Sequence, residues 1–284
     1  MKQHFISITA LSIILLLMSC GNHSAAVKNN ALPNDISANT DNKTPNEGGT
    51  MPPISAKMPD KAGKSTLQFP APDGLPIYAD LYHKDRGLPV VLLCHQAGSS
   101  KGEYATIAPR LNKLGFNCMA IDQRSGGSAF MGENLTAKEA ESRKLPTKYI
   151  DAEQDITAAI EYAFAMYDKP VILLGSSYSA SLALKVGGQN PKVWAVASFS
   201  PGEYFSDKQL IGQAAQKLNK PTFISSSKEE AAATKMIFDK VRSSEKAQFI
   251  PVGKGEHGAS ALLDSNPNAA EYWKALEGFL NKVK

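Results

Sequence analysis

A serine in a short turn is the residue of this sequence with the clearest chemical potential. The segment GSSYS at residues 175–179 follows the apolar run 171–174 and precedes a stretch rich in alanine and leucine. An apolar run that ends at glycine is typical of a buried strand, and the following stretch is typical of a helix. On such a tight turn the serine hydroxyl group is exposed, and the next amide lies free at the helix N-terminus. We therefore interpret Ser177 as a candidate nucleophile and the amide of Tyr178 as a candidate oxyanion donor.

The same turn has a purely structural interpretation. Serine and glycine turns are common after strands in α/β proteins, and a short motif alone is weak evidence of chemistry. The pattern here is G-x-S-x-S, which differs in its last residue from the complete G-x-S-x-G pattern. It matches neither of the glycine-rich patterns that bind nucleotides. The choice between the two interpretations depends on the rest of the chain.

A nucleophilic serine needs a base near neutral pH, and the sequence contains five histidines. His257 follows the last expected strand in a glycine-rich loop and is the best candidate, with an ordinary surface position as the alternative. A base histidine also needs a carboxylate that fixes its tautomer and stabilises the imidazolium ion. Glu230 and Glu229 follow the strand expected at 221–225 and are the candidates for this role.

Strands and helices are expected to alternate from about residue 64 to residue 284. The expected strands lie at 75–83, 89–94, 117–121, 171–174, 193–199, 221–225 and 247–252, and the expected helices at 103–114, after 146, after 177, 231–241 and 268–283. Regular alternation predicts an α/β fold with a mostly parallel central sheet and helices on both faces. Ligands bind at the carboxyl ends of such strands, so the loops that carry Ser177 and His257 should meet there.

Four motifs together resemble the α/β-hydrolase fold in the compact form of dienelactone hydrolases. They are HQAG, DQRSGG, GSSYS and EHG, which begin at residues 95, 122, 175 and 256 and follow the family's order through the domain. The resemblance implies a Ser-His-acid triad. In this chain the triad would be Ser177, His257 and Glu230, with Glu229 as the reserve acid.

The resemblance also implies the oxyanion hole and the purpose of two further loop residues. The amides of Ala97 and Tyr178 would stabilise the oxyanion, although Gln96 stands where relatives carry glycine. His95 is expected to brace the oxyanion loop, and Arg124 is expected to brace its own loop through backbone carbonyl groups. No long insertion is present, so we expect no large lid and a site open to solvent.

The implied reaction is cleavage of a small-molecule ester through an acyl-enzyme intermediate. Two alternatives remain open at this point. The Ser-Tyr pair at 177–178 also resembles prolyl-oligopeptidase-like peptidases, although the propeller domain of those enzymes is not in this sequence. The chain could also be an inactive lipid-anchored binding protein on a hydrolase fold, because a fold alone does not establish a function.

The first residues predict export from a bacterial cytoplasm. Lys2 and the apolar run 6–18 have the form of a signal peptide over residues 1–19. The run ends in LMSC, which resembles the lipobox of bacterial lipoproteins and implies acylation of Cys20; an ordinary secretory signal is the alternative. Residues 20–63 are poor in large apolar side chains and are expected to be a disordered tether. We therefore expect a lipid-anchored protein of the cell envelope that faces the periplasm or the exterior.

Composition argues against several other classes. The formal net charge is only +4 and no basic run is present, so nucleic-acid binding is not expected. The spacing of histidine, cysteine and carboxylate residues does not suggest a metal site, and no cofactor is implied. Cys94 and Cys118 lie in expected core strands and are interpreted as buried free thiols, with a disulfide as the alternative.

Overall fold

The computed structural model describes residues 56–128 and 132–284. The predicted signal peptide, the predicted lipidation residue Cys20 and most of the predicted tether fall outside this part of the chain. Within the described residues, no helix combines the length and the apolar character needed to cross a membrane.

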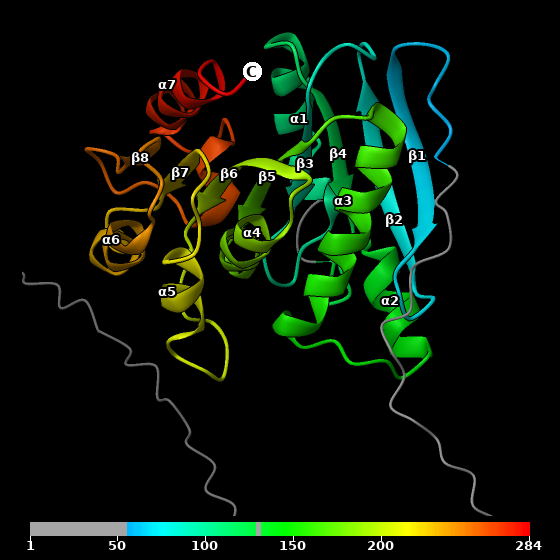
Figure 1. Ribbon diagram of the computed structural model, residues 1–284, viewed down its shortest axis with the longest axis horizontal. Helices are drawn as coiled ribbons and strands as arrows, with labels where there is room; N and C mark the ends of the chain where they lie inside the picture. The colour runs from blue at the N-terminus through cyan, green and yellow to red at the C-terminus, as the bar shows by residue number, and fades with distance from the viewer. Residues whose placement is uncertain (1–55, 129–131) are drawn as a thin grey trace, which may run out of the picture. The chain divides into compact units, whose positions relative to one another are not determined.

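The described residues form an eight-stranded sheet in the order β1-β2-β4-β3-β5-β6-β7-β8 (Figure 1). The strands are β1 (Gly63–Pro70), β2 (Pro76–His83), β3 (Val90–Cys94), β4 (Asn117–Ile121), β5 (Val171–Ser176), β6 (Val193–Phe199), β7 (Thr222–Ser225) and β8 (Lys246–Phe249). β2 runs antiparallel to both β1 and β4, and the remaining pairs are parallel. The mostly parallel sheet predicted from the sequence is therefore confirmed.

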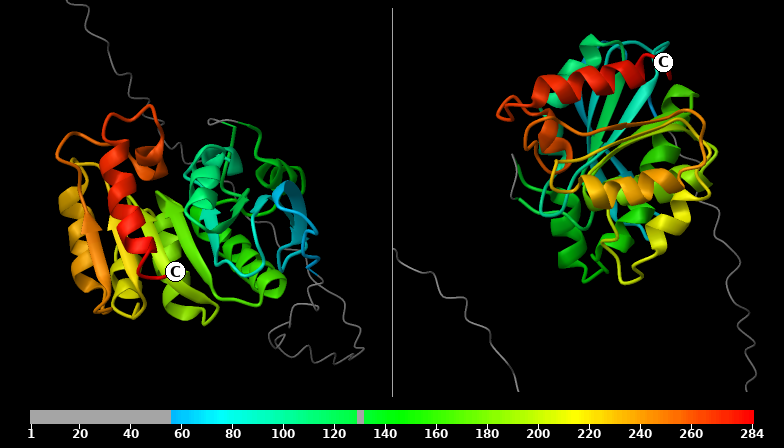
Figure 2. Two further views of the ribbon diagram at one scale, coloured as in Figure 1. Left: turned by 90° about the horizontal axis from the view of Figure 1, so that it is seen from above. Right: turned by 90° about the vertical axis from the view of Figure 1, so that its left-hand side faces the viewer.

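Helices cover both faces of the sheet (Figures 1 and 2). The α-helices are α1 (Ile107–Lys113), α2 (Leu135–Ser142), α3 (Glu153–Tyr167), α4 (Tyr178–Gln189), α5 (Leu210–Ala215), α6 (Ala231–Lys240) and α7 (Ala269–Leu280), and the 3₁₀ helices are η1 (Lys101–Tyr104), η2 (Tyr149–Ala152) and η3 (Gly258–Leu262). Side chains of α1 and α7 share one hydrophobic core, and side chains of α2 to α6 share the other. The sheet separates these two cores.

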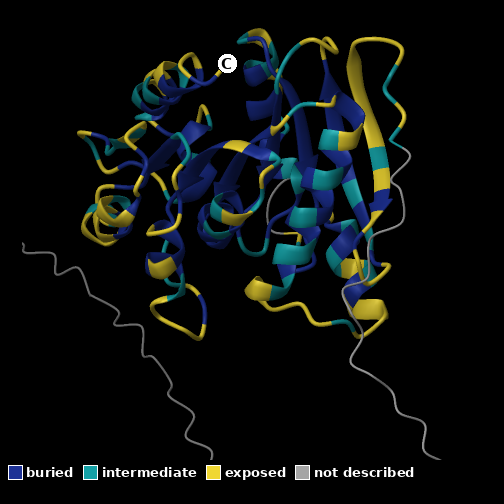
Figure 3. Cartoon of the chain, in the orientation of Figure 1, coloured by how far each residue is buried: buried dark blue, intermediate teal, exposed yellow. Residues whose placement is uncertain are grey.

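The central strands are buried on both faces, which explains their continuous apolar sequences (Figure 3). Successive side chains of a strand point to opposite faces.

The two cysteines lie on opposite faces of the sheet. In β3, Leu93 belongs to the core beneath α1 and α7, whereas Cys94 belongs to the core beneath α3 and α4. Cys118 of β4 lies in the former core, so the sheet separates the two thiols. Both cysteines are buried and free, as the sequence predicted.

The structure differs from the sequence-based expectations at four elements. β1 was not predicted because it is an edge strand whose residues are mostly exposed, so it lacks an apolar run. α2 lies in a segment where the sequence predicted no helix, and it is capped by Asn134, whose side chain accepts a hydrogen bond from the Ala137 amide at 2.8 Å. The short helix α5 was also missed. The helix expected at 103–114 is divided into η1 and α1, with Pro109 in the first turn of α1, where proline is tolerated.

Candidate active site

Ser177 lies between the end of β5 and the start of α4 in a strained backbone conformation. Its φ of 58° and ψ of −123° are unusual for a residue other than glycine and cost about 1–3 kcal/mol. The turn is tight because β5 and α4 approach each other closely. A Cβ atom at Gly175 would lie 2.3 Å from the backbone oxygen of Ser179, so this position requires glycine. The backbone amide of Ser177 donates a hydrogen bond to Phe199 O at 2.8 Å, which ties the turn to β6.

The structure brings Ser177, His257 and Glu230 into one hydrogen-bonded chain. His257 Nε2 lies 2.8 Å from Ser177 Oγ. His257 Nδ1 contacts Glu230 Oε1 on the other side of the ring. The three residues follow β5, β8 and β7 respectively, so they come from carboxyl ends of parallel strands, as expected. The arrangement allows Nδ1–H to donate to Glu230 while Nε2 accepts from the Ser177 hydroxyl group.

Besides His257, two serine residues hold Glu230 through three hydrogen bonds. Its Oε2 atom accepts hydrogen bonds from Ser200 Oγ at 2.7 Å, from Ser227 Oγ at 2.9 Å and from the Ser227 amide at 3.1 Å. Partial burial would raise the pKa of Glu230, but the hydrogen bonds from His257, Ser200 and Ser227 outweigh it and lower the pKa to about 2. The neighbouring Glu229 is exposed. Of the two acids that the sequence left open, the structure places Glu230 against the histidine.

The carboxylate of Glu230 also changes the basicity of His257. The hydrogen bond to Glu230 raises the pKa of His257 above its ordinary value, against the opposite effect of partial burial. The side chain of His257 remains 41% exposed. A base in this position is therefore reachable from solvent and is strengthened by its acidic partner.

The amides of Ala97 and Tyr178 occupy equivalent positions just beyond the ends of the neighbouring strands β3 and β5. Cys94 of β3 is paired with Gly175 of β5. Ala97 lies three residues after Cys94, and Tyr178 lies three residues after Gly175. Within the described residues, neither amide donates a hydrogen bond to the protein. Both donors are therefore available to an oxygen atom that develops negative charge beside Ser177.

Ser179 explains the departure from the complete G-x-S-x-G pattern. Its hydroxyl group donates a hydrogen bond to His95 O at 2.6 Å and lies 2.9 Å from the side-chain nitrogen of Gln123. The serine in place of glycine thus links the Ser177 turn to the loop that carries Ala97.

His95 and Arg124 brace loops and do not contact the triad. His95 is fully buried, its Nε2 atom accepts a hydrogen bond from the Gln123 amide at 2.9 Å, and burial lowers its pKa to about 4. The Arg124 guanidinium group is buried between Asp155 at 2.7 Å and Asp73 at 2.6 Å. Arg124 therefore braces its loop through carboxylates, whereas the sequence-based expectation named backbone carbonyl groups.

Sequence reasoning missed several residues around the triad. Ser200 donates to Glu230 and also accepts a hydrogen bond from the Gly258 amide at 2.9 Å, so it joins the acid to the histidine loop. Tyr204 is partly exposed, and its hydroxyl group donates to Ser200 O at 2.9 Å. Burial raises the pKa of Tyr204 to about 12, Glu230 adds to this effect, and the nearby Ser177 hydroxyl group opposes it. The position of Ser200 directly after β6 was the one available sequence signal.

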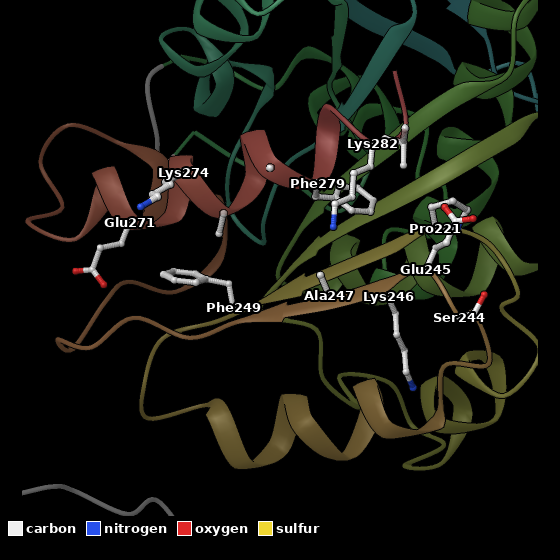
Figure 4. A pocket seen from close by; sticks show the side chains of 13 residues that line it. Pro221, Ser244, Glu245, Lys246, Ala247, Phe249, Glu271, Lys274, Phe279 and Lys282 are labelled. Carbon is white, nitrogen blue, oxygen red and sulfur yellow. The ribbon is translucent and has the colours of Figure 1, made fainter.

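A cavity of about 770 Å³ lies away from the triad, between α7 and β8 (Figure 4). Its lining includes Phe249, Phe279 and Lys282, together with residues at the amino-terminal ends of β7 and β8. The candidate triad lies at the opposite, carboxyl ends of these strands. Ser177, His257 and Glu230 do not line the cavity, so the cavity is separate from the candidate active site.

The comparisons with known proteins agree with this architecture. A family model described as "Serine aminopeptidase, S33" matches residues 87–250. A dienelactone hydrolase from Anabaena variabilis superposes with a TM-score of 0.62 at 15% identity, covering 78% of this chain and 98% of that chain. An esterase from Pyrococcus furiosus has a TM-score of 0.62 at 15% identity over 78% and 93% of the two chains.

A third similar structure is an esterase domain from Rhodothermus marinus, with a TM-score of 0.56 at 18% identity over 78% of this chain and 98% of that chain. No match was found among curated protein sequences. The α/β-hydrolase fold predicted from the sequence is confirmed.

Proposed function

The chain belongs to the family described as serine aminopeptidase S33, and we propose that it is a serine hydrolase that cleaves esters. Ser177 is the nucleophile in this proposal, His257 the general base and Glu230 the acid. The observation that carries the proposal is the continuous contact from Glu230 through His257 to Ser177, beside two unused backbone amides. The esterases and the dienelactone hydrolase among the similar structures support the choice of an ester substrate.

The proposed reaction begins when His257 Nε2 removes the proton from Ser177 Oγ as this oxygen attacks the ester carbonyl carbon. Negative charge develops on the carbonyl oxygen, where the amides of Ala97 and Tyr178 donate hydrogen bonds to it. His257 then protonates the leaving alcohol. A water molecule, activated by the same imidazole, attacks the acyl-enzyme and releases the acid.

Peptide hydrolysis is the second candidate, and the description of the family favours it. An aminopeptidase binds the α-ammonium group of its substrate and needs a carboxylate acceptor for that purpose. Of the carboxylates at the site, Glu230 contacts His257 as part of the triad, and Glu103 is buried, with one oxygen accepting a hydrogen bond from the Gln96 amide at 2.9 Å. These contacts support an ester substrate over a peptide with a free amino terminus.

Hydrolysis of p-nitrophenyl acetate by the full chain tests the proposal. We expect Ser177→Ala to lower kcat by about 10⁴- to 10⁶-fold, as removal of a nucleophile does in serine hydrolases. Ser142→Ala is the matched control, because Ser142 is an exposed serine whose hydroxyl group bonds only within α2. A parallel assay with aminoacyl p-nitroanilides measures peptidase activity. Equal rates for the parent and Ser177→Ala, together with no labelling of Ser177 by a fluorophosphonate, would favour the inactive binding protein.

We also propose that Cys20 is acylated and anchors the chain in a bacterial envelope membrane. The motif LMSC and the apolar run before it support this proposal. Expression in a bacterial host should yield a chain that enters the detergent phase and carries label from a fatty-acid analogue. Cys20→Ala should abolish both properties, and retention of the label in that variant would contradict the anchor.

A further inference from the structure

Glu103 is a buried acidic residue that the proposed triad does not use. It lies in η1, with only 2% of its surface exposed. Its Oε2 atom accepts a hydrogen bond from the backbone amide of Gln96 at 2.9 Å. Among the described residues, its buried Oε1 atom has no hydrogen-bond partner. Burial of a carboxyl group with an oxygen that lacks a hydrogen bond costs free energy, so the position of Glu103 calls for an explanation.

The surroundings of Glu103 connect the loops that carry the proposed reaction. The hydroxyl groups of Ser176 and Ser99 lie near its carboxyl group, and His257 is close enough to act on its charge. Ser176 Oγ in turn accepts a hydrogen bond from the Ala259 amide, two residues after His257, at 2.8 Å. Glu103 therefore lies where three loops meet: the loop that carries Ala97, the turn that carries Ser177 and the loop that carries His257.

The backbone around Gln96 is held on each side. His95 O accepts a hydrogen bond from Ser179 Oγ at 2.6 Å, and the Gln96 amide in the same peptide unit donates to Glu103. In the next peptide unit, Gln96 O lies 2.8 Å from His95 Nδ1. A trans peptide is planar, with its C=O and N–H groups pointing in opposite directions. These contacts therefore fix the direction of the Ala97 N–H, which belongs to the same peptide unit as Gln96 O.

We propose that Glu103 is a positioning residue, which holds the Gln96 amide so that the Ala97 N–H points at the oxyanion. This inference rests on the proposed function. A hydrogen bond to Gln96 needs only an acceptor oxygen at the right distance. Burial raises the pKa of Glu103, and the hydrogen bond from Gln96 and the Ser176 and Ser99 hydroxyl groups oppose that rise. Both the neutral and the ionised carboxyl group can accept this hydrogen bond.

Two conservative variants separate the reach of the side chain from its charge. Glu103→Gln keeps an acceptor oxygen at the same distance and cannot ionise. Glu103→Asp keeps the ionisable carboxyl group but shortens the side chain by one methylene group, which takes the acceptor away from Gln96. Both variants are polar and close in size to the parent residue. Glu229→Asp is the matched control, because Glu229 is an exposed residue of the same type.

The readout is the affinity for an aryl trifluoromethyl ketone, compared with that for the matching carboxylate product. Ser177 Oγ adds to the ketone carbon, its proton moves to His257, and the ketone oxygen becomes an oxyanion. This oxyanion accepts hydrogen bonds from the amides of Ala97 and Tyr178, so the affinity depends on the positions of these amides. We expect Glu103→Asp to weaken this inhibitor and to lower kcat/KM by about 10- to 100-fold. Binding of the product should change less than about 3-fold, because the product makes no oxyanion. Glu103→Gln should stay within about 3-fold of the parent in each measurement.

Three outcomes would overturn the inference. One is parent-like inhibition of Glu103→Asp, and another is a larger loss in Glu103→Gln than in Glu103→Asp, which would assign the effect to charge. The third is an equal loss of product and inhibitor binding in Glu103→Asp, which would indicate a general disturbance of the site. A parent protein that neither binds the ketone nor reacts with a fluorophosphonate would instead refute the proposed function on which the inference rests.

Discussion

Replacement of Glu230 by glutamine removes the charge that His257 contacts and leaves the size of the side chain nearly unchanged. The shift of the Glu230 pKa from 4.5 to about 2 corresponds to about 3 kcal/mol of favourable interaction with the ionised form. A glutamine amide can also donate a hydrogen bond to His257 Nδ1, which would favour the tautomer with a proton on Nε2. Nε2 could then no longer accept the Ser177 proton.

We therefore expect Glu230→Gln to lower kcat by about 10⁴-fold. Any residual activity should show its acidic limb at lower pH than in the parent, because the largest cause that raises the His257 pKa is lost while burial still lowers it. The free energy of unfolding should fall by up to about 3 kcal/mol at neutral pH. Since the folded-state pKa of Glu230 is depressed, this contribution exists above about pH 4.5 and is lost as the pH falls through about 2.

Steady-state hydrolysis of p-nitrophenyl acetate from pH 5 to 9, with urea unfolding at pH 7 and pH 3.5, measures these effects. Glu229→Gln is the matched control and should behave as the parent, because Glu229 is exposed. The stability difference between the parent and Glu230→Gln should be smaller at pH 3.5 than at pH 7. Full activity of Glu230→Gln together with a large loss in Glu229→Gln would refute the assignment of the acid.

Three further changes test other features of the structure. In the parent, kcat/KM should fall as the pH decreases through an apparent pKa above 6.5, because His257 must be neutral to act as base and its pKa is raised; a midpoint below 6 would contradict this. Gly175→Ala should lower the free energy of unfolding in urea by at least about 2 kcal/mol and lower activity, because the new Cβ atom would lie 2.3 Å from Ser179 O. Gly278→Ala is the control and should be neutral or stabilising, because a Cβ atom there meets open space. Arg124→Leu should destabilise the fold by about 3–5 kcal/mol by leaving Asp155 buried without its partner, and an unchanged urea midpoint would show that the ion pair contributes little.

The central elements could be predicted from the sequence because their burial leaves a local signal. β3 and β5 are covered on both faces, so each is a short continuous apolar run that ends near glycine or a polar loop. Ser177 and His257 each follow an expected strand, and ligands bind at the carboxyl ends of the strands in such a sheet. These two facts were enough to predict that the two residues lie close together. Counting from the β7 strand selected Glu230 and kept its neighbour Glu229 in reserve, because which acid faces the histidine depends on the start of α6.

The remaining features depend on contacts between distant segments, which leave little local signal. β1 pairs with β2 through its backbone and exposes most side chains, so its sequence lacks the pattern of a core strand. Ser200 and Glu103 are one hydroxyl and one carboxyl group among many in the sequence. Their relation to the triad follows from loops that converge from separate strands, and no spacing rule describes that convergence.

The separation of the two cysteines by the sheet gives each hydrophobic layer its own chemical reporter. Cys94 faces the layer beneath α3 and α4, and Cys118 faces the layer beneath α1 and α7. Burial raises the pKa of both thiols, so neither reacts with an alkylating reagent while its layer stays closed. Mass spectrometry of pulse-alkylated protein would therefore time the opening of each layer separately. Equal rates would indicate that the two layers open as one cooperative unit, and unequal rates would identify the layer that opens first.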